Sequence, residues 1–193
     1  MILSVFAGSI AFSGSVAAAP ASIDTDNSSI TPATVDEGST NTYSFTLNAS
    51  ELNTSQGSDQ IFSVNLPDNF TIYSSSVTAG GVTVNEGGVG VSSTSVDSAN
   101  SVINVTLNDN AGSDPDTVNI SFSADITAPE VSGDTTVNAR FGVDYNATGD
   151  FSETNDAGYE NFQQIAITDS GVGPQSGSPE LVSAIHYDND PSS

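Results

Sequence analysis

The residues best suited to covalent chemistry in this chain are asparagines in Asn-x-Ser/Thr sequons. Sequons without a central proline occur at seven positions: Asn27, Asn48, Asn53, Asn69, Asn104, Asn119 and Asn146. In an exported protein a sequon is an acceptor for N-glycosylation. Asn104 and Asn119 are predicted on the solvent-facing side of their strands, where an acceptor must lie. The alternative is that a chain rich in Asn, Ser and Thr generates sequons by chance.

Residues 144–150 read Asp-Tyr-Asn-Ala-Thr-Gly-Asp and match the first half of an oxygen-ligand calcium loop. Such loops place hard oxygens at alternate positions, and the candidate ligands here are Asp144, Asn146, Thr148 and Asp150. The bidentate Glu expected at the twelfth position is replaced by Asn155. Calcium is therefore a candidate cofactor, and the alternative is a solvated acidic turn.

Few residues could support catalysis. A Ser-His-Asp arrangement would need His186, the only histidine, which follows a flexible stretch near the end of the sequence. With no cysteine and one histidine, a zinc site is excluded. Pairs of carboxylates carry no information among 24 acidic residues, and the absence of Trp removes the usual platform of a glycosidase. The sequence predicts a protein that is not an enzyme.

The charge balance points to concentrated salt. The chain has 24 acidic residues against a single Arg, Arg140, and its formal net charge is −23. In dilute buffer this charge repels itself, whereas at molar salt the screening length falls to about 3 Å. The same balance excludes nucleic acid and anionic membrane surfaces as partners, because both need Lys and Arg. An ion pair with a neighbouring Asp is expected for Arg140.

Residues 1–21 are predicted to be a signal peptide. Ile2 to Ala11 is apolar, and small residues follow as far as Ala21. The stretch is too short, and too rich in Gly and Ser, for a membrane span. Cleavage is expected after Ala18 or Ala21. No basic residue precedes the apolar run, so we expect Met1 to be internal and the start to lie upstream.

Residues 1–19, from Met-Ile-Leu-Ser-Val-Phe to Val-Ala-Ala-Ala, resemble the signal peptide of haloarchaeal surface glycoproteins. In that family a basic segment precedes the position of Met1, and this chain lacks it. The resemblance implies export and a salt-loving archaeal source, with no implication for the mature domain. The family's main S-layer members also carry a Thr-rich stalk and a C-terminal anchor, which this sequence does not show.

Strict alternation of apolar and polar residues predicts β-strands throughout the body of the chain. The apolar positions of these runs are Tyr43, Phe45 and Leu47; Phe62, Val64 and Leu66; Ile103, Val105 and Leu107; Val118, Ile120, Phe122, Ala124 and Ile126; Val137, Ala139, Phe141, Val143 and Tyr145; and Ile165 and Ile167. Turn signals separate the runs, and no stretch has a helical period. The pattern predicts an all-β fold, an antiparallel β-sandwich that is Ig-like in broad architecture.

The predicted organisation is a signal peptide over 1–21, a β-sandwich domain over 22–169, and a linker with a C-terminal tail over 170–193. The tail could also open a second domain. The first functional hypothesis is an N-glycosylated structural or interaction module, extracellular or at the cell surface of a halophilic archaeon. Its partners would be other surface proteins or itself, and its mature domain would not span a membrane.

Two alternatives remain open from the sequence. One is a pilus-like filament subunit whose segment Ser22 to Val35 adds a strand to the next copy. That hypothesis requires the segment to leave its own sheet. The other is a non-catalytic accessory domain of a secreted hydrolase.

Overall fold

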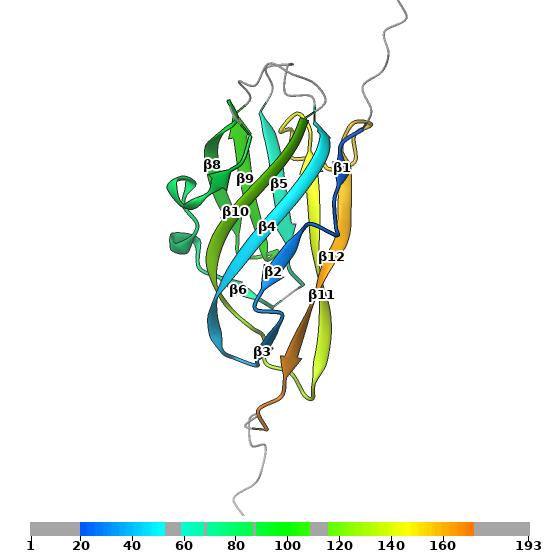
Figure 1. The fold of residues 1–193 in the computed structure, drawn as a ribbon. Helices are drawn as coiled ribbons and strands as arrows, with labels where there is room; N and C mark the ends of the chain where they lie inside the picture. Colours follow the sequence, from blue (N-terminus) through cyan, green and yellow to red (C-terminus); the bar gives the residue numbers. More distant parts are fainter. Residues whose placement is uncertain (1–19, 53–58, 68, 87, 109–115, 172–193) are drawn as a thin grey trace, which may run out of the picture.

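The computed structural model describes residues 20–52, 59–67, 69–86, 88–108 and 116–171, and within them the fold is two packed β-sheets without an α-helix (Figure 1). Sheet A contains β1 (Ser22–Ile23), β2 (Ser29–Thr31), β4 (Thr40–Leu52), β10 (Asp116–Thr127), β6 (Thr71–Ile72) and β7 (Thr83–Val84). Sheet B runs in the order β3 (Thr34–Asp36), β12 (Ala157–Thr168), β11 (Thr135–Asp144), β5 (Gln60–Asn65), β9 (Val102–Asn108) and β8 (Gly90–Asp97). The predicted antiparallel β-sandwich is confirmed.

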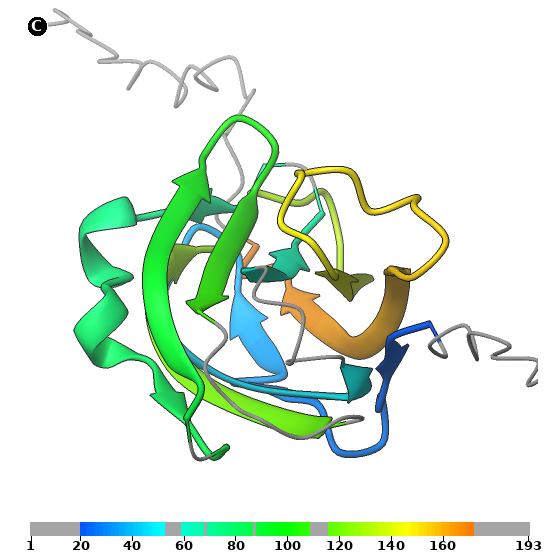
Figure 2. The same cartoon turned by 90° about the horizontal axis from the view of Figure 1, so that it is seen from above.

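The core lies between the two sheets, where their apolar faces meet. On β4 and β10 every second side chain is buried, from Tyr43 to Ala49 and from Val118 to Ile126. Sheet B contributes Phe62, Phe141 and most of the other apolar residues that alternation identified. Figure 2, viewed along the long axis, shows the sheets curving around this interior, with the 3₁₀ turns η2 (Ser74–Ser76) and η3 (Ala79–Gly81) at one side.

The segment from residue 22 to residue 36 belongs to both sheets of its own chain. β1 and β2 pair antiparallel with β4 in sheet A, and β3 pairs parallel with β12 in sheet B. Ile30 and Val35 are buried in the shared core. The strand-donating filament hypothesis requires this segment to extend away from the domain. Here the segment instead lies in the sheets of its own chain.

The described chain begins and ends at opposite poles of the sandwich (Figure 1). At the N-terminal pole, the Ala21 amide donates to the carbonyl of Asn155, in the loop between β11 and β12. At the C-terminal pole, the Asp169 amide donates to the carboxylate of Asp134, in the loop between β10 and β11. No helix in the described residues is long and apolar enough to cross a membrane.

Candidate functional site

The outer surface of sheet A carries a regular array of hydroxyl and amide side chains, here called the hydroxyl face. Its centre is formed by the outward residues of β4 and β10, which face one another directly across the two strands. The five pairs are Thr40 with Thr127, Thr42 with Asp125, Ser44 with Ser123, Thr46 with Ser121, and Asn48 with Asn119. The array exists because both strands alternate polar with buried apolar residues in matching register.

The array continues onto the flanking strands. Ser29 of β2 lies opposite Thr46, and Thr83 of β7 lies opposite Ser121, so one row places four hydroxyls across four strands. Beneath the row, the rings of Phe45 and Phe122 stack with centroids 4.8 Å apart. This packing holds β4 and β10 in fixed register, so the outward hydroxyls have fixed positions.

Bonds between facing side chains leave much of the polar capacity of the hydroxyl face unused. Thr40 and Thr127 share a hydrogen bond of 2.6 Å, whereas the Ser44 and Ser123 hydroxyls lie 3.4 Å apart, at the limit of a hydrogen bond. Each hydroxyl has one donor and two acceptor sites. The pair of Ser44 with Ser123 therefore retains donors and acceptors for another molecule.

A hollow of about 320 Å³ lies on this face, between the two central strands and the segment that carries η3 and β7. Its lining is uncharged: Ser44, Phe45, Thr46, Gly81, Thr83, Ser121, Phe122 and Ser123. Nearby, Tyr73 is 45 % exposed and is the single large hydrophobic side chain exposed in the described chain. Its hydroxyl lies 3.2 Å from that of Thr127, which attaches this aromatic ring to the edge of the hydroxyl face.

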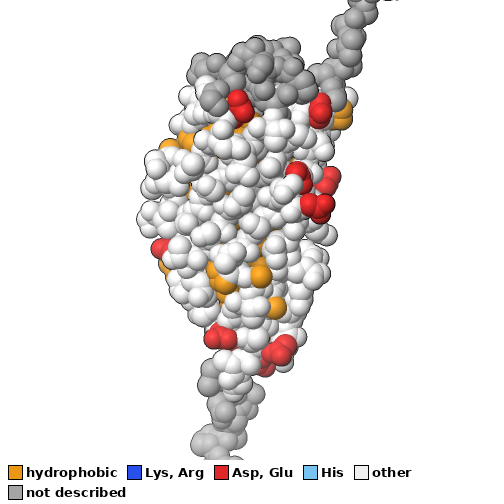
Figure 3. Space-filling view, in the orientation of Figure 1, with side chains coloured by type: hydrophobic (Ala, Val, Ile, Leu, Met, Phe, Trp, Pro, Cys, Tyr) orange, Lys and Arg blue, Asp and Glu red, His pale blue; other side chains and the backbone are white. Residues whose placement is uncertain are grey.

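The hydroxyl face is nearly free of charge in a chain of net charge −23. Among the five facing pairs, the only charged residue is Asp125, which accepts a hydrogen bond of 2.6 Å from Thr42. Figure 3, in which β4 and β10 face the viewer, shows this side of the molecule largely uncharged, with acidic side chains mainly toward its margins and ends. A neutral molecule can therefore approach here without meeting the acidic surface.

The predicted glycan acceptors differ in exposure. Asn27, Asn69 and Asn146 are exposed, whereas Asn48, Asn104 and Asn119 point outward from their strands but are half-buried. The side-chain oxygens of Asn48 and Asn104 are buried and have no hydrogen-bond partner among the described residues. Asn53 lies outside the described residues, as does His186. Exposure therefore separates the sequons into two groups that their sequence pattern did not distinguish.

The candidate calcium loop is organised by hydrogen bonds of its own. Asp144 is fully buried, and its two carboxylate oxygens accept from the amides of Asn146 (3.1 Å) and Gly149 (2.6 Å). Glu153 accepts from the side chains of Asn146 and Thr148. A hydrogen bond from Ser152 lowers the pKa of Asp150. Across the described ranges, no group of three or more His, Asp or Glu residues could hold a metal ion.

Among the described residues, Arg140 contacts Tyr159 rather than the neighbouring Asp expected for it. Its guanidinium lies over the ring of Tyr159, 5.3 Å from the centroid, and donates to the Tyr159 carbonyl at 3.4 Å. The Tyr159 hydroxyl shares a hydrogen bond of 2.6 Å with Ser63, and its ring packs on Phe151. Gly142 makes room for this cluster, because a Cβ there would lie 3.1 Å from the Tyr159 ring.

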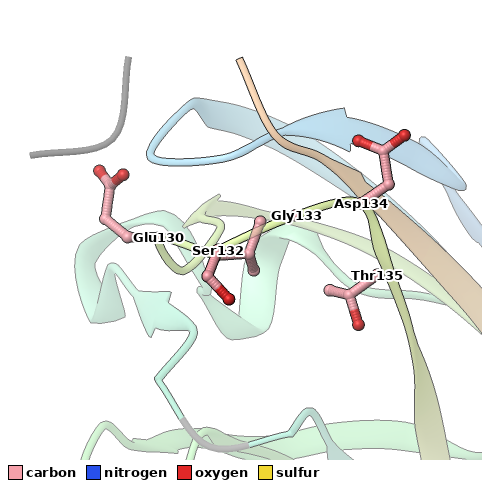
Figure 4. A pocket seen from close by; sticks show the side chains of 6 residues that line it. Glu130, Ser132, Gly133, Asp134 and Thr135 are labelled. Atoms are coloured by element: carbon pink, nitrogen blue, oxygen red, sulfur yellow. The ribbon is translucent and has the colours of Figure 1, made fainter. Parts of the chain in front are cut away.

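The C-terminal pole is acidic and holds the end of β12. Glu37, only 8 % exposed, accepts hydrogen bonds from the Val131 amide (3.0 Å) and from the amide and hydroxyl of Ser170. These bonds lower the pKa of Glu37, and the bond from Val131 has the largest effect. A polar hollow beside them is lined by residues 130–135; Figure 4 shows the Glu130 and Asp134 side chains at it.

Comparison with known proteins gives structural likenesses only. No protein-family model matches the chain, and no curated protein matches its sequence. The major pilin subunit of Bacillus cereus superposes with a TM-score of 0.43 at 9 % identity, over 77 % of this chain and 40 % of the pilin. The major pilin of Streptococcus agalactiae gives 0.39 at 10 % identity, over 77 % and 56 %.

The collagen adhesin of Staphylococcus aureus gives a TM-score of 0.36 at 14 % identity, over 74 % of this chain and 49 % of the adhesin. The chain thus spans about half, or less, of the length of these structures. Scores this low carry no argument about activity or partners. The function is therefore inferred from the sequence and the geometry of this chain.

Proposed function

We propose that this chain is an exported, non-enzymatic structural module at the cell surface of a salt-adapted archaeon. The observation that carries the proposal is the arrangement of the two poles. The described chain enters the sandwich at one end and leaves it at the other, and hydrogen bonds hold both ends. A domain whose two ends lie at opposite poles can link neighbouring parts of a cell envelope. Its long outer faces then stay free for contacts.

Export is supported by the signal-like sequence over 1–21 and by the start of the folded domain. Ala21 is buried, and its amide bonds to Asn155. Cleavage after Ala21 would remove this contact, whereas cleavage after Ala18 would keep it. We therefore favour Ala18 of the two sites.

Glycosylation is supported by the three exposed sequons. Acceptor asparagines must reach an external enzyme, so glycans are expected at Asn27, Asn69 and Asn146 before any of the half-buried positions. Asn48 and Asn119 lie at one end of the hydroxyl face. Without glycans there, that face remains open.

A strand-donating filament is less well supported. Residues 22–36 are already paired with β4 and β12 of their own chain. Donation of this segment to a neighbour would expose Ile30 and Val35, which are buried in the core.

The test is expression in a salt-loving archaeal host from the upstream start expected for the gene, with and without the segment that ends at Ala18. We expect the full chain at the cell surface or in the medium, cleaved after Ala18 and carrying glycan mass at Asn27, Asn69 or Asn146. The deletion should remain inside the cell without glycans. Retention of both forms in the cytoplasm, uncleaved and unmodified, would refute the proposal.

A further inference from the structure

We infer that the hydroxyl face of sheet A binds a neutral oligosaccharide. This inference rests on the proposed surface role, and it names the ligand class through which the module would make contact. It follows from three features that coincide on this face: the charge, the hydrogen-bonding capacity and the position of one aromatic ring.

Charge restricts the ligand to a neutral molecule. The chain's net charge of −23 repels polyanions, and its only Arg lies on sheet B, over the ring of Tyr159, rather than on this face. Cations are attracted to the acidic C-terminal pole, where Glu37 and Asp134 lie, rather than to the nearly uncharged rows of β4 and β10. An anion meets the repulsion of the whole acidic chain, and a cation binds better elsewhere, so a neutral ligand is the class that this face suits.

The hydrogen-bonding pattern suits a polyhydroxylated ligand. Five hydroxyl side chains line the hollow of about 320 Å³: Ser44, Thr46, Thr83, Ser121 and Ser123. Each can both donate and accept, as each hydroxyl of a sugar can. The volume of the hollow is close to the lower limit for small-ligand sites, about 300 Å³. The hollow is also open, so a longer sugar chain could continue beyond it.

Tyr73 gives the site an apolar platform and a direction. The ring lies on the β6 side of β10, because the Tyr73 amide bonds to the Asp125 carbonyl and its hydroxyl to Thr127. Asp125 is two residues from Ser123, and Thr127 is four, so the platform lies roughly 7–14 Å along β10 from the hollow. Aromatic side chains stack on the apolar faces of sugar rings, while the hydroxyls at the edges of the sugar rings form hydrogen bonds. An oligosaccharide of several units could occupy the hollow and reach Tyr73.

The experiment measures calorimetric binding of maltohexaose, cellohexaose, chitohexaose and mannohexaose in molar KCl, with hexagalacturonate as the anionic comparator. The protein is the full chain, purified in salt from whichever compartment holds it, so that failure of export and failure of binding are separate results. The variants are Ser44→Ala with Ser123→Ala, and Tyr73→Ala. Ser93→Ala with Thr136→Ala, exposed positions on sheet B, is the matched control.

We expect at least one neutral hexasaccharide to bind and hexagalacturonate not to bind. Each lost hydrogen bond should weaken affinity by about twofold to tenfold, and the Tyr73 variant should lose a similar factor. The sheet B control should bind as the unmodified chain does, and circular dichroism should show all variants folded.

Either of two results would overturn the inference. One is the absence of binding by every neutral sugar, or binding that the Ser44, Ser123 and Tyr73 changes leave intact. The other is self-association of the chain, seen by light scattering and abolished by the same changes, with no sugar bound. In that case the occupant of the face is a second copy.

Discussion

At the scale of single residues, two tyrosines differ in whether the hydroxyl has a hydrogen-bond partner. Tyr43 is fully buried, and its hydroxyl has no hydrogen-bond partner among the described residues. Tyr159 is half-buried, and its hydroxyl bonds to Ser63 at 2.6 Å. A buried hydroxyl without a partner has lost its bonds to water, whereas a paired hydroxyl has exchanged them.

The two Tyr→Phe changes should therefore have opposite effects. Tyr43→Phe should raise the free energy of unfolding by about 1 kcal/mol, and Tyr159→Phe should lower it by about 1 kcal/mol. Chemical denaturation at molar salt measures both. Loss of stability in the Tyr43 variant would mean that its hydroxyl is bonded in solution.

The stability of the chain at alkaline pH gives a second test of Tyr43→Phe. Burial raises the pKa of Tyr43 from 10.0 to about 12 in the folded chain. The unfolded chain ionises first, so wild-type stability from this group is complete below pH 10 and falls as the pH rises toward 12. The Phe variant lacks this loss, so its advantage should widen over that range.

At the scale of elements, Glu37 accepts hydrogen bonds from Val131 and Ser170, a group here called the Glu37 clamp. These bonds connect the turn before β4 to the loop before β11 and to the end of β12. Its folded pKa lies below the ordinary 4.5 because the Val131 amide and Ser170 bond to the carboxylate. A lowered pKa contributes stability above pH 4.5, and that contribution is lost as the pH falls through the folded value.

Glu37→Gln tests the clamp. The denaturant midpoint of the variant should lie below that of wild type at neutral pH, and the gap should close as the pH falls below 4.5. Glu160→Gln, an exposed position on β12, is the control. A gap that is constant with pH would show that the carboxylate charge is not what holds Ser170.

The pairing of β2 with β4 makes a second element-scale prediction. Ser29 lies opposite Thr46, and facing residues of antiparallel strands are close enough for a disulfide. Ser29→Cys with Thr46→Cys should therefore form an intramolecular bridge, and the protein should run as a monomer on a non-reducing gel. A ladder of linked copies would instead show that the segment is donated, with Thr46→Cys alone as the control.

Sequence alternation predicted the long strands because each has one buried and one exposed side. It gave no signal for β8, whose Gly-Val-Ser-Ser-Thr-Ser-Val-Asp is largely polar and which is held mainly by its pairing with β9. The role of Glu37 could not be predicted either, because its partners Val131 and Ser170 are distant in sequence. The hydroxyl face needed the register of β4 with β10, which a pattern within one strand does not contain.

At the scale of the whole molecule, charge and shape fit a single environment. Most acidic residues of the described chain lie at least partly exposed, with Glu37 and Asp144 as the buried ones. One Arg stands against 24 acidic residues, so pairing within the chain cannot neutralise the net charge of −23. Screening by dissolved salt is the remaining way to lower this repulsion, at a screening length of about 3 Å in molar salt.

The most direct test of the central claim, a surface module adapted to brine, is the free energy of unfolding of the mature chain from dilute buffer to molar KCl. We expect this free energy to rise steeply with salt, with the chain unfolded or only marginally folded in dilute buffer. Equal stability across the whole range would contradict it. The acidic surface would then need another explanation, and the case for a salt-adapted envelope protein would fail.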